Sequence, residues 1–309
     1  MTITIGVHRS NPSLYHLARL GLAEQALAPF GETVAWHEYA DGTATARLLV
    51  EGVIDFGGTG STPPLTGQAQ GYDIVYVAVS APRPDHGALL VAENGPVRTV
   101  ADLTGGTVVF GVGSWQTHLL AKALHDAGLS YQDIVAQRPT ESPVPPLARL
   151  LAGEIAGWVA QEAELAAARR RGGVRTLVDT GSVISDRSVF FTRRDVAEQR
   201  PDVVATLVGT LQQADNWVAD HLTEAAARAA ADIGGNESDW HTALGGLPWR
   251  LQSVPAGFIA EQQEAADILA RAGYLDHPIT VADAEVTALA PLVDAALATV
   301  TPVPAGRGR

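Results

Sequence analysis

The sequence predicts an α/β fold divided into two lobes, and three observations support this prediction. Apolar, β-branched segments alternate with amphipathic segments, which is typical of mainly parallel sheets flanked by helices. The alternation restarts after a Pro-Arg-Pro sequence at residues 82–84. A strand-to-helix turn rich in glycine and hydroxyl side chains lies on each side of that restart. Two such turns indicate two lobes that share one ligand.

The individual elements follow from the spacing of apolar residues. In the first block, strands are expected at residues 2–7, 33–37, 52–56 and 74–79, with helices near 13–27, 43–51 and 62–70. In the second block, strands are expected at 88–91, 108–110, 174–178 and 188–191, with a helix over 117–124. Helical patterns over 201–232 and 258–272 close the chain. We therefore expect residues 1–84 and 192–309 to form lobe 1, residues 85–191 to form lobe 2, and the ligand cleft to lie between them.

Composition excludes several classes of function. The 309 residues carry a formal net charge of −13, which argues against binding nucleic acid because that requires a basic face. No segment approaches the roughly 20 apolar residues of a membrane span. The absence of cysteine excludes disulfides, thiolate metal sites and thiol catalysis. The histidines show no metal-ligand spacing, so we expect no metal. We also expect no cofactor and a monomeric protein.

The beginning of the sequence bears on the compartment. Residues 2–7 read as a strand, with no basic segment, apolar core or cleavage site ahead of them. This predicts a cytoplasmic protein if Met1 is the native start. The alternative is an exported or lipid-anchored protein whose leader has been removed.

The two turns supply the candidate ligand contacts. The first places Gly60, Ser61 and Thr62 at the start of a helix, and the second does the same with residues 114–116. Free backbone N–H groups and hydroxyls at a helix start can hold an anion. Isolated turns of this kind are more often simple helix caps, but their recurrence favours a shared cleft.

Several segments resemble the aliphatic sulfonate, taurine and nitrate group of ABC-transporter substrate-binding proteins. They are residues 60–71, 100–106, 113–134, 155–162, 186–188, 200–204 and 259–263. The resemblance covers nearly the whole chain and implies a two-lobed type II periplasmic-binding-protein fold whose lobes close by a hinge. It also implies a small anionic, sulfonate-like organic ligand and, if the protein is exported, an ABC permease as partner.

The resemblance places the ligand at the loop after the first strand and at the two turns. The implied contacts are His8, Arg9, Ser10, Gly60, Ser61, Thr62, Ser114, Trp115 and Gln116, with Trp158, Gln161 and Arg187 as further candidates. A sulfonate keeps its charge at physiological pH, so its site needs hydrogen-bond donors rather than a titrating base. Arg9 could add a bidentate contact, and Trp115 or His8 could stack on the rest of the ligand.

Other polar residues have simpler interpretations. Residues 169–171 are three arginines at the end of an Ala-rich helix, where positive charge complements the helix C-terminus, so we expect solvated side chains. His118 lies in an amphipathic helix and is expected to be packed. Asp85 and His86 lie at the expected crossing between lobes and could face the cleft.

An enzyme is the alternative reading. The same fold hosts cytoplasmic enzymes, including an aromatic sulfinate desulfinase that the chain resembles around residues 113–115. That enzyme uses a cysteine nucleophile in the loop after the first strand, whereas this chain has His8 there and contains no cysteine. A lyase or hydrolase could still use His8 as general acid or base. No nucleophile, base and orienting group can be ordered from the sequence.

Overall fold

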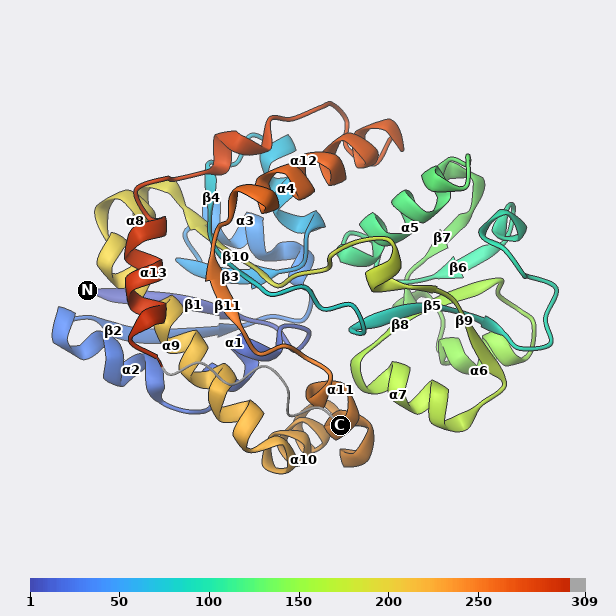
Figure 1. Cartoon of the computed structure of the whole chain (residues 1–309), viewed down its shortest axis with the longest axis horizontal. Helices are drawn as coiled ribbons and strands as arrows, with labels where there is room; N and C mark the ends of the chain where they lie inside the picture. Colours follow the sequence, from blue (N-terminus) through green and yellow to red (C-terminus); the bar gives the residue numbers. More distant parts are fainter. Residues whose placement is uncertain (301–309) are drawn as a thin grey trace.

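The computed structural model describes residues 1–300 and contains two sheets that lie side by side along the long axis of the molecule (Figure 1). The first has the order β11-β4-β10-β3-β1-β2 and the second the order β7-β6-β8-β5-β9. The first sheet consists of β1 (Thr2–Val7), β2 (Thr33–Glu38), β3 (Phe56–Thr59), β4 (Ile74–Ser80), β10 (Val189–Arg193) and β11 (Leu251–Ser253). The second consists of β5 (Gly87–Ala92), β6 (Thr107–Val109), β7 (Val135–Gln137), β8 (Gly157–Gln161) and β9 (Val174–Asp179).

Helices cover both sheets. Those packed with the first sheet or following it are α1 (Pro12–Leu17), α2 (Leu22–Leu27), α3 (Thr45–Val50), α4 (Thr62–Ala69), α8 (Arg194–Gln199), α9 (Pro201–Asp220), α10 (Leu222–Ile233), α11 (Glu237–Gly245), α12 (Ala256–Arg271) and α13 (Ala290–Ala298). The second sheet carries α5 (Trp115–Asp126), α6 (Pro146–Leu151) and α7 (Glu162–Arg171). Short 3-10 turns are η1 (Ala28–Phe30), η2 (Gly42–Ala44), η3 (Val100–Leu103), η4 (Tyr131–Asp133), η5 (Pro139–Glu141), η6 (Thr180–Ser182) and η7 (Val281–Ala284).

Strand direction follows from how the chain passes between the lobes. Strands β1, β2 and β3 are parallel, as are β6, β7 and β8. Strand β5 enters its sheet directly from the first lobe and β10 returns directly from the second, so each begins at the cleft and runs antiparallel to its neighbours. Because β10 pairs with β3 and β4, residues 189–191 belong to the first sheet and not, as expected from the sequence, to lobe 2.

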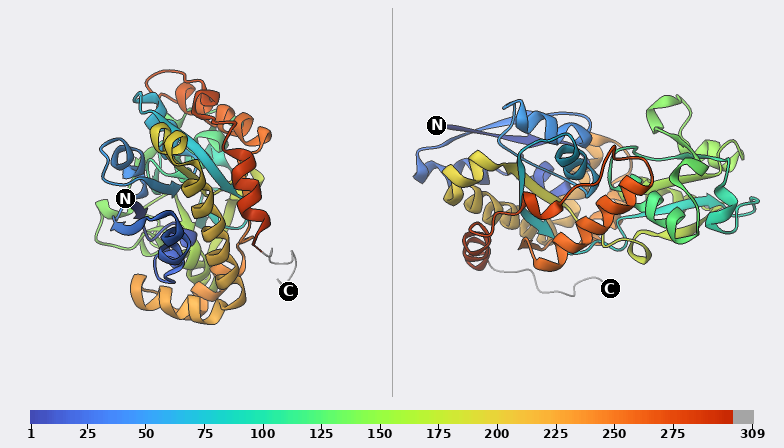
Figure 2. Two further views of the ribbon diagram at one scale, coloured as in Figure 1. Left: turned by 90° about the vertical axis from the view of Figure 1, so that its left-hand side faces the viewer. Right: turned by 90° about the horizontal axis from the view of Figure 1, so that it is seen from above.

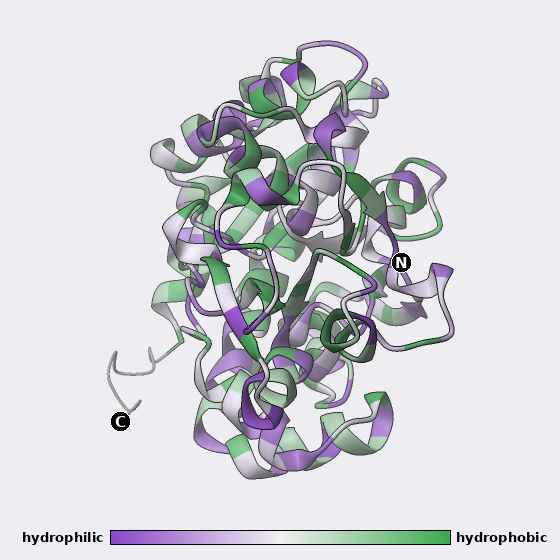
Figure 3. Ribbon diagram, turned by 90° about the vertical axis from the view of Figure 1, so that its right-hand side faces the viewer, coloured by the Kyte–Doolittle hydropathy of each residue, from purple (hydrophilic) through white to green (hydrophobic). Residues whose placement is uncertain are grey.

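The cores lie on both faces of each sheet. One apolar cluster joins β1 and β10 to α1, α2, α9 and α13, and another lies on the opposite face under α3, α4 and α12. Strand β4 is buried along its whole length because both faces are covered. The second lobe has corresponding clusters under α5 and under α6 and α7. The view from above in Figure 2 shows these layers, and Figure 3 shows hydrophobic residues gathered on the inner strands.

Most expected elements are present, with instructive differences. The expected strand at 52–56 has the wrong bounds, since β3 begins at Phe56 and includes two glycines that were expected in the turn. The expected helix near 13–27 is broken at Gly21, which has a φ of 66°. Strands β7, β8 and β11, of three to five residues, were not expected. Within residues 1–300, no helix is long and apolar enough to cross a membrane.

Candidate ligand-binding site between the two lobes

The carboxyl ends of the parallel strands in both lobes face the region between the lobes. Strands β1 and β3 lead there from the first lobe, and β6 and β8 from the second. Residues 81–86 and 185–188 cross between the sheets at the same place. Ligands of open α/β sheets bind in crevices at the carboxyl ends of strands, so this region is the candidate site.

The β3–α4 turn has hydroxyl groups that do not cap the helix. Ser61 has helical backbone angles and makes no side-chain cap, and its Oγ lies instead 3.1 Å from His118 Nδ1 in the other lobe. The Oγ1 of Thr62 is buried and has no hydrogen-bond partner within the described residues. Pro63 and Pro64 have no N–H group, so the backbone donors at this helix start are the N–H groups of Ser61 and Thr62, which precede the first bonds within the helix. The start of α4 therefore offers these two N–H groups and the Thr62 hydroxyl as donors.

The β1–α1 loop adds two buried groups. His8 Nε2 lies 2.9 Å from the carbonyl oxygen of Gly58, which can only accept, so this nitrogen carries the proton. Burial lowers the pKa of His8, which leaves Nδ1 as an acceptor at neutral pH. Asn11 caps α1 through Oδ1, while its Nδ2 is buried. Neither His8 Nδ1 nor Asn11 Nδ2 has a partner in the described chain. Arg9 and Ser10 are exposed.

The β6–α5 turn of the second lobe satisfies its own polar groups. Ser114 caps α5 by accepting from Gln116 N at 3.2 Å, and its hydroxyl donates to Gly111 O at 2.7 Å. Gln161, at the end of β8, accepts from Trp115 Nε1 at 3.2 Å and from Gln116 Nε2 at 2.8 Å. These bonds fix the Trp115 ring, which is only 4% exposed.

Trp115 is where the two lobes meet. A Cβ added at Gly60 would lie 2.7 Å from Trp115 Cβ, so the backbone of the β3–α4 turn rests directly on this residue. Gly87, at the start of β5, is equally close to the far edge of the same ring. Glycine is required at both positions because any side chain would displace the indole.

A buried charged cluster, consisting of Arg83, His86, Glu162 and Asp186, links the crossing segments to the second lobe. Arg83 Nη2 lies 3.0 Å from Asp186 Oδ2, and the same oxygen lies 2.9 Å from His86 Nδ1. On the other side of the ring, His86 Nε2 lies 3.6 Å from Glu162 Oε1. The geometry places His86 between two carboxylates.

The charges in this cluster stabilise one another. Burial raises the pKa of Asp186, but Arg83 and His86 outweigh burial and hold it below its ordinary value. Burial and Arg83 lower the pKa of His86, but Asp186 and Glu162 outweigh them and hold it above its ordinary value. Glu162 and Asp186 have φ values of 50° and 36°. Such conformations are uncommon for non-glycine residues and concentrate at functional sites.

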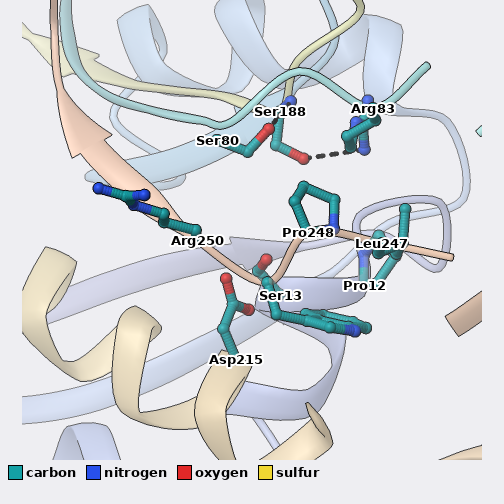
Figure 4. Close-up of a pocket in the computed structure, with 10 residues that line it drawn as sticks. Pro12, Ser13, Ser80, Arg83, Ser188, Asp215, Leu247, Pro248 and Arg250 are labelled. Atoms are coloured by element: carbon teal, nitrogen blue, oxygen red, sulfur yellow. Dashed lines mark hydrogen bonds between the residues drawn. The ribbon is translucent and has the colours of Figure 1, made fainter. Parts of the chain in front are cut away.

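A small pocket lies beside this cluster in the first lobe (Figure 4). Ser80, Arg83 and Ser188 line one side, and Ser13 and Asp215 lie opposite. Burial raises the pKa of Asp215 to about 7, although a hydrogen bond from Ser13 opposes the shift. The Oδ1 of Asp215 has no partner among residues 1–300.

Two candidates from the sequence are engaged elsewhere. Trp158 is 4% exposed and packs in the core of the second lobe under α6 and α7. Arg187 lines a small pocket together with Ser61 and His118, but it forms a bidentate ion pair with Glu261 of α12, at 3.0 and 3.2 Å, so its charge is already neutralised. Across residues 1–300, no group of three or more His, Asp or Glu side chains could hold a metal ion.

The sequence analysis missed two residues and undervalued two others. Asn11 was not considered, although an Asn directly before Pro12 is a recognisable helix start. Glu162 stood only at the end of a segment that carries the resemblance and was not singled out. Arg83 stood out only as part of a chain break, and Asp186 only through the resemblance, because burial of a charged side chain cannot be deduced from its neighbours in the sequence.

Comparison with known proteins identifies the family. The NMT1/THI5-like family model matches residues 31–225. A protein of Escherichia coli (strain K12) named as an aliphatic sulfonates-binding protein is 34% identical over 237 residues, which cover 76% of this chain and 73% of the relative. A protein of Bacillus subtilis (strain 168) with the same name is 26% identical over 289 residues, covering 91% of this chain and 84% of the relative.

Comparison with solved structures finds proteins of the same kind. The periplasmic aliphatic sulphonate binding protein SsuA of Escherichia coli superimposes with a TM-score of 0.82 at 29% identity over 91% of both chains. The alkanesulfonate-binding protein SsuA of Xanthomonas axonopodis pv. citri, solved with bound MOPS, gives 0.80 at 28% identity over 92% of this chain and 98% of that one. The desulfurization enzyme DSZB has the same fold, with a TM-score of 0.65 at 16% identity over 96% of this chain and 99% of that one. The chain therefore has the two-lobed periplasmic-binding-protein fold and belongs to the NMT1/THI5-like family.

Proposed function

We propose that this protein is a solute-binding protein that captures a small organic sulfonate between its lobes. The observation that carries the proposal is the pair of buried donors, Asn11 Nδ2 and Thr62 Oγ1, which have no partner within residues 1–300 and lie at the starts of the helices that follow the adjacent strands β1 and β3. Buried polar atoms in folded proteins are almost always hydrogen-bonded, so unpartnered ones in a crevice are candidate ligand contacts. The named function of the relatives at 34%, 29% and 28% identity supports the same ligand class.

The chemistry of the site suits a permanent anion. The donors are an amide, a hydroxyl and the backbone N–H groups of Ser61 and Thr62, none of which titrates near neutral pH. The fixed indole of Trp115 faces the turn that carries these donors and provides an apolar wall for the rest of the ligand. His8 Nδ1 is an acceptor when the ring is neutral, so it does not contact the sulfonate oxygens, which also only accept.

We further propose that the lobes close on the ligand by movement at the two crossing segments, residues 81–86 and 185–188. Both segments are short, and the Arg83–Asp186 pair joins them, so they can turn together. The periplasmic location of the Escherichia coli SsuA favours the exported form of this protein over the cytoplasmic form. An ABC permease is the corresponding partner, and we expect a monomer.

The enzyme alternative receives no comparable support. His8 Nε2 is bonded to the Gly58 carbonyl, and within residues 1–300 Nδ1 has no hydrogen-bond partner that could serve as a nucleophile or an orienting carboxylate. The likeness to DSZB, at 16% identity, establishes a common fold and nothing about chemistry.

Isothermal titration with methanesulfonate, butanesulfonate and MOPS, against butyrate as a carboxylate of similar length, tests the proposal. Asn11→Asp keeps the oxygen that caps α1 but replaces the donor with a second acceptor oxygen, so sulfonate affinity should fall by about a hundredfold or more. Asn94→Asp, which makes the same charge change at an exposed site, should leave binding unchanged. Mass spectrometry of the recovered ligand completes the test. Failure to bind any sulfonate, or release of a chemically altered compound, would overturn the proposal.

A further inference from the structure

The lobes also meet on the two flanks of the cleft, away from the candidate ligand contacts. On one flank α7 of the second lobe packs against α11, and on the other α5 packs against α12 (Figure 1). Both α11 and α12 belong to the helices that follow the first lobe's last central strand. Contacts between these helices therefore report the relative position of the lobes.

The α7–α11 flank contains a bidentate ion pair. Arg170 Nε and Nη2 donate to the two carboxylate oxygens of Asp239 at 2.9 and 2.8 Å. The Arg170 side chain is 57% exposed, whereas the Asp239 side chain is only 4% exposed and also accepts from Asn236 at 3.1 Å. These hydrogen bonds hold the pKa of Asp239 below its ordinary value. Bidentate pairing of this kind fixes both distance and orientation.

Apolar contacts surround this ion pair. Ala163 of α7 belongs to the same buried cluster as Trp240 and Leu244 of α11. Separation of the two helices would expose this cluster and leave a nearly buried carboxylate without its cation. Because Arg170 is more than half exposed, the cost of separation falls on the Asp239 carboxylate, which would keep only its hydrogen bond from Asn236.

The opposite flank is built differently. Lys122 of α5 lies 3.0 Å from Glu264 of α12, but it also lies 3.2 Å from Asp126 on its own helix. The Glu264 side chain is 58% exposed. If this contact opened, Lys122 would keep Asp126 and Glu264 would be solvated. An exposed, shared pair of this kind contributes little.

The neighbours of Arg170 show that its role is specific. Arg169 pairs with Asp179 at 3.5 Å, but both belong to the second lobe and both are about half exposed. Arg171 is exposed at the end of α7. Arg170 is exposed, as expected for residues 169–171, but unlike its neighbours it also donates two hydrogen bonds to Asp239, which lies 69 residues away in the sequence.

We propose that the Arg170–Asp239 pair is an interlobe latch that favours the closed arrangement of the lobes before any ligand binds. The latch goes beyond the proposed function, since it concerns the balance between open and closed molecules whatever the ligand is. A ligand that requires the closed state would bind more tightly in proportion to the closed fraction.

The absence of native cysteine allows a direct test. Val53 in the first lobe and Val144 in the second are 37% and 44% exposed, so a V53C/V144C variant can be spin-labelled at those two sites alone. Pulsed dipolar spectroscopy then gives the interlobe distance distribution without ligand. Asp239→Asn and Arg170→Gln should each raise the ratio of open to closed molecules by about threefold or more. Arg169→Gln is the matched control and should leave the distribution unchanged.

The charge-swapped variant R170D/D239R distinguishes loss of the ion pair from local misfolding. If the latch is correct, the swap should restore part of the short-distance population that each single variant loses, with circular dichroism unchanged throughout. The proposal is overturned if the folded single variants keep the wild-type distribution. It is also overturned if they open but the swap restores nothing, since their effect would then be local damage to α11. Because no ligand is used, failure of the sulfonate-binding proposal would not affect this result.

Discussion

The two strand-to-helix turns look alike in sequence and differ in what their polar groups do. In the β6–α5 turn, Ser114 caps its own helix and the Gln116 side chain folds back onto Gly111 N at 2.7 Å. In the β3–α4 turn, Ser61 leaves its helix uncapped and Thr62 Oγ1 has no partner among the described residues. One turn is internally complete and the other is not.

This difference gives the two lobes different roles at the candidate site. The complete turn holds Trp115 rigidly, because Gln161 bonds to both Trp115 and Gln116. The incomplete turn presents donors toward that ring. Under the proposed function, the first lobe recognises the anion, and the second supplies a rigid wall. Substitutions at the two turns should therefore have separable effects on affinity and stability.

The largest effect is expected where the turns touch. Gly60→Val would force its side chain into Trp115 Cβ, which lies 2.7 Å from an added Cβ, and would hold the lobes apart. We expect sulfonate affinity to fall by about a hundredfold or more, while each lobe remains folded. Titration and small-angle scattering measure the two consequences. Gly257→Ala, where an added Cβ meets nothing within 4 Å, is the control. Unchanged affinity would show that the contact is not needed for closure.

Much of the fold could be predicted from the sequence because local patterns encode it. Strands β1, β2 and β4 have long apolar runs, and both turns carry recognisable glycine and serine. The boundary at residue 191 could not be placed, because β10 reads as a strand whichever sheet it joins. The bounds of β3 were predicted wrongly because Gly57 and Gly58 suggest a turn. Their lack of side chains instead lets Thr45 and Phe190 pack against the strand.

Ser61 of the β3–α4 turn and His118 of α5 share a hydrogen bond between the lobes. The buried His118 should make the stability of the protein depend on pH. Burial lowers the pKa of His118 to about 4, from 6.5 in an unfolded chain. Between these values the unfolded chain binds more protons than the folded protein, so this histidine makes stability fall as pH drops from about 6.5 to about 4. The loss amounts to about 3 kcal/mol.

His118→Asn isolates this contribution, since the substitution removes the titrating ring. The difference in unfolding free energy between the wild type and this variant should shrink by about 3 kcal/mol from pH 7 to pH 4, measured by urea denaturation. Parallel pH curves for the two proteins would show that His118 is not held neutral at the interface.

The site was less predictable than the fold, for a physical reason. Helix-start donors at residues 60–62 and 114–116 were found from local sequence. Whether a donor is free depends on groups far along the chain, such as His118, which occupies the Ser61 hydroxyl. The charged cluster joins Arg83 to Asp186 across 103 residues. Only the folded arrangement distinguishes Ser114, which is satisfied, from Thr62, which is not.

A smaller effect on binding is expected at Thr62. Thr62→Val preserves the shape of the side chain and deletes only the hydroxyl, so affinity for a sulfonate should fall by about tenfold. The control is Thr66→Val, one helical turn further on, where the hydroxyl already donates to Thr62 O at 3.2 Å. Equal losses in the two variants would indicate a general change in α4 instead of a lost ligand contact.

The smallest effect is expected at Ser114, and it should appear in stability alone. Its Oγ accepts from Gln116 N and donates to Gly111 O, so its hydrogen bonds remain within the turn. Ser114→Ala should lower the free energy of unfolding by about 1 kcal/mol through loss of the helix cap. Affinity should change little, since the bonds from Gln161 still fix Trp115. Thr62→Val should do the reverse, because it removes a hydroxyl with no partner in the folded protein. If Ser114→Ala instead weakened binding as much as Thr62→Val, the two turns would share recognition of the anion, and the division between a donor lobe and a wall lobe would be wrong.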